Sequence, residues 1–396
     1  MKRLKMVLLA ALAVGSSGVS AQPGDTLKFE TIIENPITSV KDQNRSGTCW
    51  AFSSLGFFES ELLRLSGKTY DLCESFLIYR TMIDRAHASV RLHGDISFSQ
   101  GGSFYDAVYC LKNYGMCPQE AMPAPGSLYG DTLYDHNELD QITTAYVNSI
   151  AKGNQKKLSS QWDKGLYAIY DAYLGELPET FEYEGKTYTP KSFAESLDID
   201  PDDYVSLTSY THHPFYTTFA IEVQDNWRWG LSYNLPLEEF MEVMDSAVRN
   251  GYTFAWGADV SEPNFSKSGP NVGVATVPAG EKTKDAKGSD QARWTGEIGQ
   301  EGKPAAEPQE EKVITQELRQ EGFDNWTTTD DHGMLIYGLA KDQNGKEYFM
   351  MKNSWGDYNL YHGMAYISKA YAAYKTLNIL IHKDAIPKDI AKKLGL

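Results

Sequence analysis

The sequence predicts an α+β protein. In the first third, apolar residues recur at intervals of three and four after residues 50 and 72, which is typical of amphipathic helices. The last third instead contains short apolar runs separated by turn residues, which is typical of strands. Two long segments between these regions have mixed composition. We therefore expect a helical half, a β-rich half and insertions between their elements.

Length, composition and charge narrow the class of protein. The 396 residues can bury a sizeable core, and 41% hydrophobic with 23% charged residues is typical of a soluble globular protein. The 37 Lys+Arg against 53 Asp+Glu give a net charge of -16. Nucleic acid is not expected as a partner, because phosphate binding requires a concentrated basic face. The 4 Cys are too few for a disulfide scaffold.

Residues 1–21 have the features of an export signal. A basic start precedes an apolar run over residues 6–14, which is too short to span a bilayer. Val19-Ser20-Ala21 then offers a small-residue cleavage site. We expect a secreted or periplasmic protein that is cleaved near Ala21 and retains no membrane span.

The helices follow in chain order. Each has an apolar face and a recognisable end, either a glycine just beyond it or a capping serine before it. The expected helices cover Ala51–Leu65 before Gly67, Leu72–Ala86, Phe104–Tyr114 between Ser103 and Gly115, and Pro236–Asn250 before Gly251.

The strands follow later in the chain. Tyr252–Val260 is the first expected strand. Met334–Ala340 and Tyr348–Met351 flank Asn344-Gly345, a strong hairpin signal, and residues 363–368 supply another strand.

Two segments are interpreted as insertions, at about 128–225 and 262–312. The first is mixed and rich in Tyr and Asp, which suggests an inserted subdomain. The second is rich in Gly, Pro, Ser, Lys and Glu, so we expect a long surface excursion, with a functional lid as the alternative.

Cys49 is the candidate nucleophile. It lies where a glycine-containing turn meets a helix start, and the partial positive charge there favours a thiolate. A cysteine at a helix start is more often structural, so the case depends on its neighbours. Gln43, six residues upstream, could donate to an oxyanion together with the Cys49 backbone N–H.

His332 is the candidate base among eight histidines. It lies at the entrance to an apolar strand, its neighbours Asp330 and Asp331 would favour the imidazolium, and Gly333 leaves room at the ring. Asn353 ends the next strand and could orient the ring, with Trp355 shielding that hydrogen bond. A two-residue hairpin would leave His332 and Asn353 about four residues out of register, so the loop must be longer or the strands strongly coiled.

Four separated motifs resemble the papain-like cysteine peptidases. They are Gln43, Gly47-Thr48-Cys49-Trp50-Ala51-Phe52, Asp331-His332-Gly333 and Asn353-Ser354-Trp355-Gly356. The resemblance implies a papain-like fold, in which a helical half carries the nucleophile helix and the β-rich half is barrel-like. It implies Cys49 as nucleophile, His332 as base and acid, Asn353 as orienter and Gln43 as oxyanion donor. Substrate binding would involve Gly101, Gly102 and Trp355.

Departures from papain point to the bleomycin hydrolase and aminopeptidase C branch. Ser46 and Ser99 stand where a family disulfide is usual, and the chain from Cys49 to His332 is about twice the roughly 130 residues found in papain. This branch implies helical insertions, and a chain terminus in the cleft whose carboxylate holds the ammonium of a short peptide. It also implies an aminopeptidase and a homo-oligomer, a hexamer by resemblance. An exported location departs from the cytosolic members.

Several alternatives stay open. Cys110 and Cys117 could form a local disulfide, and Cys73 is interpreted as a core residue. No metal and no cofactor are expected, because His212-His213 and the pair His87 and His93 lack partners at ligand spacing. The rival functions are an endopeptidase of the same fold and a catalytically silent binding protein.

Overall fold

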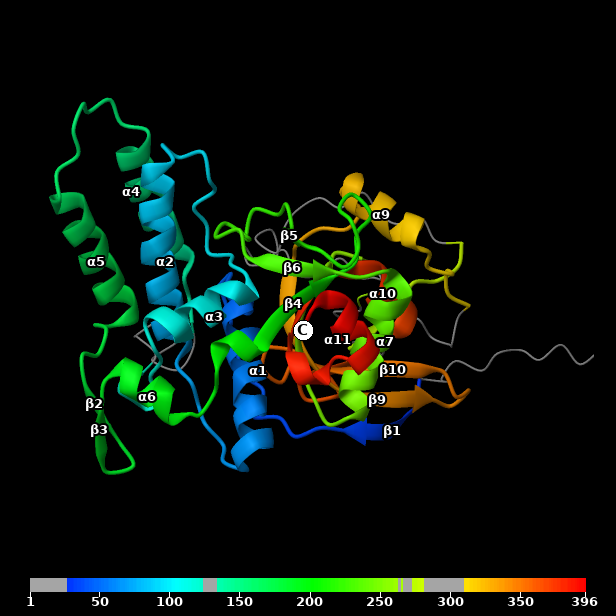
Figure 1. Ribbon diagram of the computed structural model, residues 1–396. Coiled ribbons are helices and arrows are strands. Elements are labelled where there is room, and N and C mark those ends of the chain that lie inside the picture. The colour runs from blue at the N-terminus through cyan, green and yellow to red at the C-terminus, as the bar shows by residue number, and fades with distance from the viewer. Residues whose placement is uncertain (1–26, 124–133, 263–264, 266–272, 281–309) are drawn as a thin grey trace, which may run out of the picture.

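The computed structural model describes residues 27–123, 134–262, 265, 273–280 and 310–396. The expected export signal therefore lies outside the described residues, as does most of the segment 262–312. Figure 1 shows helices gathered on one side and a large sheet with its own helices on the other. The described part of the chain contains no helix long and apolar enough to cross a bilayer.

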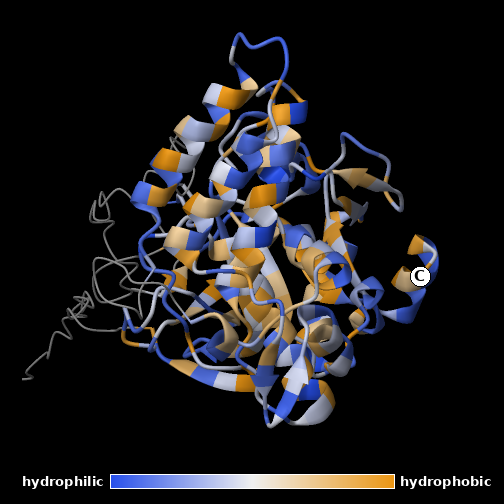
Figure 2. Ribbon diagram, turned by 90° about the vertical axis from the view of Figure 1, so that its left-hand side faces the viewer, coloured by the Kyte–Doolittle hydropathy of each residue, from blue (hydrophilic) through white to orange (hydrophobic). Residues whose placement is uncertain are grey.

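The helical side is built around α1, which begins at Cys49. Gly67 follows its last residue and has a left-handed backbone conformation that ends the helix. The helices of this side are α1 (Cys49–Ser66), α2 (Glu74–Arg91), α3 (Phe104–Asn113), α4 (Asn137–Ala151), α5 (Gln161–Leu174) and α6 (Pro190–Ser196). Ser103 and Asp106 form a capping box at the start of α3, as the serine there indicated. Helices α1, α2, α4 and α5 share one apolar core. In Figure 2 the helices nearest the viewer alternate hydrophobic and hydrophilic residues along their length.

The second side is a mixed sheet. Its described strands follow the order β5-β6-β4-β12-β7-β9-β10-β11-β8, with β1 added to β9. The strands are β1 (Phe29–Glu34), β4 (Tyr204–Thr208), β5 (Thr218–Ala220), β6 (Leu231–Asn234), β7 (Phe254–Ala258), β8 (Val274–Ala275), β9 (His332–Asp342), β10 (Glu347–Lys352), β11 (Met364–Ser368) and β12 (Thr376–His382). Helices α7 (Leu237–Arg249), α9 (Gln316–Asp324), α10 (Lys369–Lys375) and α11 (Lys388–Leu394) accompany them. A second apolar core lies between this sheet and α7, α10 and α11.

The segment 128–225 divides between the two sides. Helices α4, α5 and α6 and the small hairpin of β2 (Phe181–Tyr183) and β3 (Lys186–Tyr188) lie on the helical side. Strands β4 and β5 instead join the main sheet, where β4 pairs with β12. The expected insertion therefore also contributes strands to the β-rich half.

The hairpin of β9 and β10 resolves the expected register mismatch. Its loop is one residue longer than a two-residue turn, because the Asp342 N–H donates to the Lys346 carbonyl at 2.9 Å. A bulge adds one more residue, since Met350 faces Gly338 whereas Met351 faces Ile336. Continued along the strands, this register leaves Asn353 two residues from the position opposite His332. Residues offset by two share a face of the sheet and remain within reach.

The last residues of the chain lie away from the expected place. Ile390 and Leu394 on α11 are buried in the core of the β-rich side, and Lys393 binds Glu239 on α7 at 2.8 Å. Figure 2 shows this end of the chain at the edge of the molecule. The expectation that the terminus occupies the cleft is therefore not met. The physical reason is the apolar face of α11, which packs against the sheet side.

All four cysteines are thiols in the structure. The expected partner of Cys117 was Cys110, but the Cys110 thiol lies 3.8 Å from the Gly115 carbonyl. The residue opposite Cys117 is Cys73, whose N–H donates to the Cys117 carbonyl at 3.1 Å. Burial raises the pKa of the Cys110 thiol to about 12. A hydrogen bond with Cys73, followed by burial, raises the pKa of Cys117 as well, so these thiols are inert core groups.

Candidate active site

Cys49 is the first residue of α1, and its side chain lines a cleft. Thr48 takes the cap position, where its carbonyl accepts the Ala51 N–H at 2.9 Å. The Ser53 hydroxyl donates to the Cys49 carbonyl at 2.8 Å and fixes the first turn. The positive end of the helix macrodipole at this position favours the thiolate over the thiol. The structure thus places Cys49 at a helix start and in a cleft, and its role as nucleophile stays a prediction.

His332 begins β9 and meets Asn353 just beyond the end of β10. Its Nε2 lies 2.8 Å from Asn353 Oδ1, and both side chains are buried. The Ser354 N–H donates to the same oxygen at 2.8 Å. A backbone N–H can only donate, so this contact fixes the amide with its oxygen toward the ring. His332 Nε2 must therefore carry a proton, and the neutral ring has its lone pair on Nδ1.

Trp355 covers this pair. Its ring stacks on the imidazole with centroids 4.7 Å apart. The described residues that line the cleft do not include Trp355. Its position fits the expected shielding of the hydrogen bond, whereas its role in substrate binding stays a prediction.

The loop before α1 is bound to the segment that carries Asn353 and Trp355. The Gln43 N–H donates to the Ser354 carbonyl at 2.8 Å, and Asp42 pairs with Trp355 as an isolated β-bridge. Main-chain hydrogen bonds therefore fix the approach to Cys49 relative to the orienting residues of the opposite half.

The cleft has a volume of about 650 Å³ and is lined from both halves of the molecule. The helical side contributes Gly47, Cys49, Trp50 and residues 99–105. The sheet side contributes His332, Gly333, Asp324 at the end of α9, and acidic residues of the loops, namely Glu222, Asp225, Asp330 and Asp331. The nucleophile and base predicted from the sequence thus face one cavity.

Gly101 and Gly102 lie on the wall of this cleft, where neighbouring groups occupy the space of a side chain. A Cβ on Gly102 would lie 2.7 Å from the Trp50 ring, and a Cβ on Gly101 would lie 1.9 Å from Asp225 Oδ2. The Gln100 side chain accepts the Gly47 N–H at 2.8 Å, and its carbonyl accepts the Trp50 indole at 2.9 Å. The paired glycines are thereby anchored beside the start of α1.

Gln43 is fully buried behind the cleft wall. Its Oε1 accepts the Ser354 hydroxyl at 2.5 Å, and its Nε2 donates to the Ser46 carbonyl at 2.8 Å. An amide nitrogen carries two N–H groups, and Ser46 accepts one of them. The side chain is therefore rigidly oriented, and its function as an oxyanion donor stays a prediction.

Two neighbours of His332, Asp331 and Gly333, also hold the structure around it. The Asp331 carboxylate accepts the Val260 N–H at 3.1 Å and the Thr329 hydroxyl at 2.7 Å, so it fixes the loop that precedes β9. Gly333 makes room for α1, because a Cβ there would lie 2.5 Å from Ser53 Oγ. The glycine therefore allows β9 to pack closely against the nucleophile helix.

Three of the four histidines that were expected to lack partners have them. His87 lies 2.7 Å from Asp163, and Glu222 contacts His212 at 3.0 Å and His213 at 2.9 Å. Gln320 Nε2 donates to His212 Nδ1 at 3.0 Å, so Nε2 of that ring carries the proton and points it at Glu222. His212, His213 and Glu222 place their ligand atoms within 4.8 Å of one another, so the expectation that this histidine pair lacks partners at ligand spacing is wrong. The absence of a metal stays a prediction.

Two polar contacts near the site were missed by sequence reasoning. The Ser354 hydroxyl donates to the Gln43 side chain. The Asp225 carboxylate packs against Gly101, with the fully buried Arg85 beside it. The Ser354 contact crosses between the two halves, and Asp225 belongs to a segment with many aspartates. No local pattern marks either residue.

Comparisons with known proteins agree with this geometry. A family model described as the Peptidase C1-like family matches residues 13–272. Aminopeptidase G of Lactobacillus delbrueckii subsp. lactis is 23% identical over 90% of this chain and 83% of its own length. Aminopeptidase C of Listeria monocytogenes is 20% identical over 98% of this chain and 90% of its own length.

A solved structure shares the fold. The crystal structure of PepW from Lactobacillus rhamnosis HN001 superposes with a TM-score of 0.65 at 17% identity, over 92% of this chain and 84% of its own. The predicted α+β, papain-like class is confirmed, and so is the resemblance to the aminopeptidase C branch. Since the family match covers more than half of the 396 residues, the chain belongs to the Peptidase C1-like family and is a cysteine peptidase.

Proposed function

We propose that the protein is an exported aminopeptidase that cleaves short peptides through Cys49, His332 and Asn353. The observation that carries the site is the buried hydrogen bond from His332 Nε2 to Asn353 Oδ1, in a cleft that Cys49 also lines. It supports a ring held in one orientation, with Nδ1 as the nitrogen that exchanges protons. An orienting partner of this kind is what a cysteine–histidine site requires.

The reaction would proceed in two steps. The Cys49 thiolate attacks the peptide carbonyl carbon, and the Cys49 N–H and Gln43 Nε2 stabilise the resulting oxyanion. His332 Nδ1, which has taken the proton of the Cys49 thiol, gives this proton to the leaving amine, which departs and leaves a thioester on Cys49. The neutral ring then takes a proton from water, whose oxygen attacks the thioester and releases the acid.

Two further observations support the aminopeptidase and its location. Two of the relatives that span most of this chain carry the names aminopeptidase G and aminopeptidase C. A basic start and an apolar run precede the small residues at Val19-Ser20-Ala21, which supports export. An N-terminus at Gln22 in protein recovered from the periplasm or medium would be the expected mature form.

The decisive experiment combines cleavage with labelling. Cys49→Ala should abolish the hydrolysis of a fluorogenic peptide and labelling by a thiol-directed epoxide. The matched control is Cys110→Ala, which removes a buried thiol outside the cleft and should leave both readouts intact. Retained cleavage by Cys49→Ala would refute the proposed nucleophile. Faster cleavage of an N-acetylated peptide than of its free-amine twin would indicate an endopeptidase instead.

A further inference from the structure

An aminopeptidase has to recognise the ammonium group at the start of its substrate. A carboxylate within the cleft is the natural partner, because it makes charge-assisted hydrogen bonds to an ammonium. The chain terminus does not supply it here, since α11 packs near α7 and the described cleft lining contains nothing beyond Asn378. Another carboxylate must therefore do this if the proposed function holds.

Asp225 has the required position. Its carboxylate lies directly on Gly101, where Oδ2 occupies the space that a side chain would take. Gly101 follows Gln100, which is bonded to Gly47 and Trp50 on either side of Cys49. Asp225 is thus tied to the nucleophile helix through a short chain of contacts, and it lines the same cleft.

The carboxylate is also held in place by Arg85. Arg85 lies beside it with a fully buried side chain, and its Nη2 is 3.3 Å from Asp225 Oδ1. Its shorter bonds go to backbone carbonyls, at 2.8 Å from Nε to Ser97 and at 2.5 Å from Nη1 to Gly101. Arg85 therefore holds the main chain at Gly101 in place, and its positive charge pairs with the Asp225 carboxylate. Both of its contacts to this carboxylate are to Oδ1, and within the described chain no hydrogen-bond donor contacts Oδ2.

Other carboxylates of the cleft are engaged differently. Glu222 is bonded to two histidines, and Asp331 holds the loop before β9. Asp324 accepts a hydrogen bond from Gln320 at 2.8 Å. Among these four carboxylates, Asp225 is the one that contacts Gly101, and its side chain is 28% exposed.

We propose that Asp225 binds the N-terminal ammonium of the substrate and makes this peptidase select free amino ends. The inference rests on the proposed function, which supplies the nucleophile and the peptide. Asp225 is a specificity-determining residue, so removing its charge should change which peptides are cleaved and leave the chemistry at Cys49 intact.

The test compares two fluorogenic peptides that differ only in an N-terminal acetyl group. Asp225→Asn should lower kcat/KM for the free-amine peptide about 10- to 100-fold, the range expected for losing a hydrogen bond to a charged group. Its kcat/KM for the acetylated peptide should stay the same or rise. Glu222→Gln removes a carboxylate from the same cleft and should keep the wild-type preference, as should deletion of residues 395–396.

A pH series separates recognition of the ammonium from a structural effect. The wild-type preference for the free amine should fall as the pH passes about 8, where a peptide α-amine loses its proton. The preference of Asp225→Asn should not change there. If the Asn variant does not fold, Asp225→Ser serves as the second neutral variant.

The possible results distinguish this inference from the proposed function. If Asp225→Asn still prefers the free-amine peptide as the wild type does, the assignment is overturned. If deletion of residues 395–396 abolishes this preference, the role belongs to the chain terminus. If wild-type protein cleaves neither peptide, or if Cys49→Ala still cleaves, the proposed function itself fails.

Discussion

His332 is held by two side chains that follow the same strand. Asn353 fixes its plane through Nε2, and Trp355 covers its face. The Asn353 amide is itself fixed, since Ser354 donates to its oxygen and its nitrogen donates to the Tyr358 hydroxyl at 3.2 Å. The ring therefore has one orientation before any substrate arrives, which is what efficient proton transfer requires.

Asn353→Ala should lower kcat by about 10²-fold with a smaller change in KM, because the ring is then free to turn from its productive position. Steady-state kinetics on a free-amine peptide would measure this. Tyr358→Phe is the matched control, because it removes the hydrogen-bond partner of the amide nitrogen and leaves the contact of the amide oxygen to His332 intact. Equal losses in both variants would contradict an orienting role for Asn353.

The sequence predicted these residues better than it predicted their surroundings. Cys49, His332 and Asn353 lie in short motifs of unusual composition, so local reading is sufficient to find them. Asp225 and Gly101 are 124 residues apart, and their contact depends on how β5 and the loop after it approach the helical side. Such a contact has no local signature.

At the scale of the elements, β9 and α1 approach each other closely at Gly333. A Cβ at this position would lie 2.5 Å from Ser53 Oγ and 3.3 Å from the Trp50 Cα. Strand β9 carries His332, the proposed base, and α1 carries Cys49, the proposed nucleophile, so the separation of these elements sets the distance between the two groups.

Gly333→Ala should destabilise the protein by about 1–3 kcal/mol and lower kcat, because β9 must move away from α1 to accept the methyl group. Urea unfolding and kinetics would measure the two effects. In a Ser53→Ala background the nearest clashing atom is absent, so the destabilisation should be smaller. Additive effects of the two substitutions would show that the close approach is not the cause.

Elements with a strong local pattern were predicted well. The apolar faces and caps of α1, α2, α3 and α7 and the turn between β9 and β10 placed these elements within a few residues. The bulge opposite Met350 and the pairing of β4 with β12 were not predicted. They depend on which strands meet in space, and the position of a bulge is set by packing rather than by turn residues.

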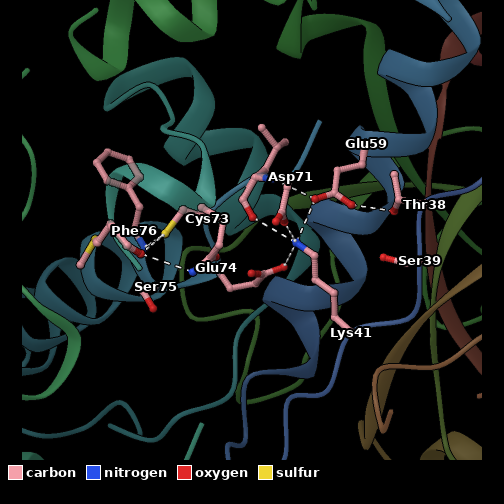
Figure 3. Close-up of polar contacts among 12 residues, drawn as sticks. Thr38, Ser39, Lys41, Glu59, Asp71, Cys73, Glu74, Ser75 and Phe76 are labelled. Atoms are coloured by element: carbon pink, nitrogen blue, oxygen red, sulfur yellow. Dashed lines mark hydrogen bonds and ion pairs between the residues drawn. The ribbon is translucent and has the colours of Figure 1, made fainter. Parts of the chain in front are cut away.

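At the scale of the whole molecule, the two halves meet at a buried cluster of charges. Figure 3 shows Lys41 between Glu59 on α1 and Glu74 on α2, at 3.0 Å and 2.7 Å. Lys352 on β10 reaches toward the same cluster from the sheet side, and it donates to Thr38 Oγ1 at 3.0 Å. The Thr38 hydroxyl in turn donates to Glu59 at 2.7 Å.

This cluster predicts a dependence of stability on pH. Burial lowers the pKa of Lys352 from 10.5 to about 8. Between these two values the unfolded chain binds the proton and the folded protein does not, so the free energy of unfolding should rise with pH across this window. From pH 7.5 to 9.5 the wild type should gain about 2 kcal/mol relative to Lys352→Met.

Urea unfolding of both proteins at the two pH values would measure this gain. Lys341→Met, which removes a half-exposed lysine from the neighbouring strand, controls for the loss of a positive charge. Parallel curves for wild type and Lys352→Met would contradict the prediction. The window closes near pH 10, because burial raises the pKa of tyrosines such as Tyr204 and their ionisation then opposes folding.

The same cluster has a consequence for how substrates enter. If the two halves moved apart, Lys352 would lose its hydrogen bonds to Thr38, and β10 would separate from the loop before α1. The main-chain bonds from Gln43 to Ser354 would break in the same motion. If the proposed function holds, we therefore expect a cleft of fixed width, which admits peptides according to the bulk of their chain and does not close around them.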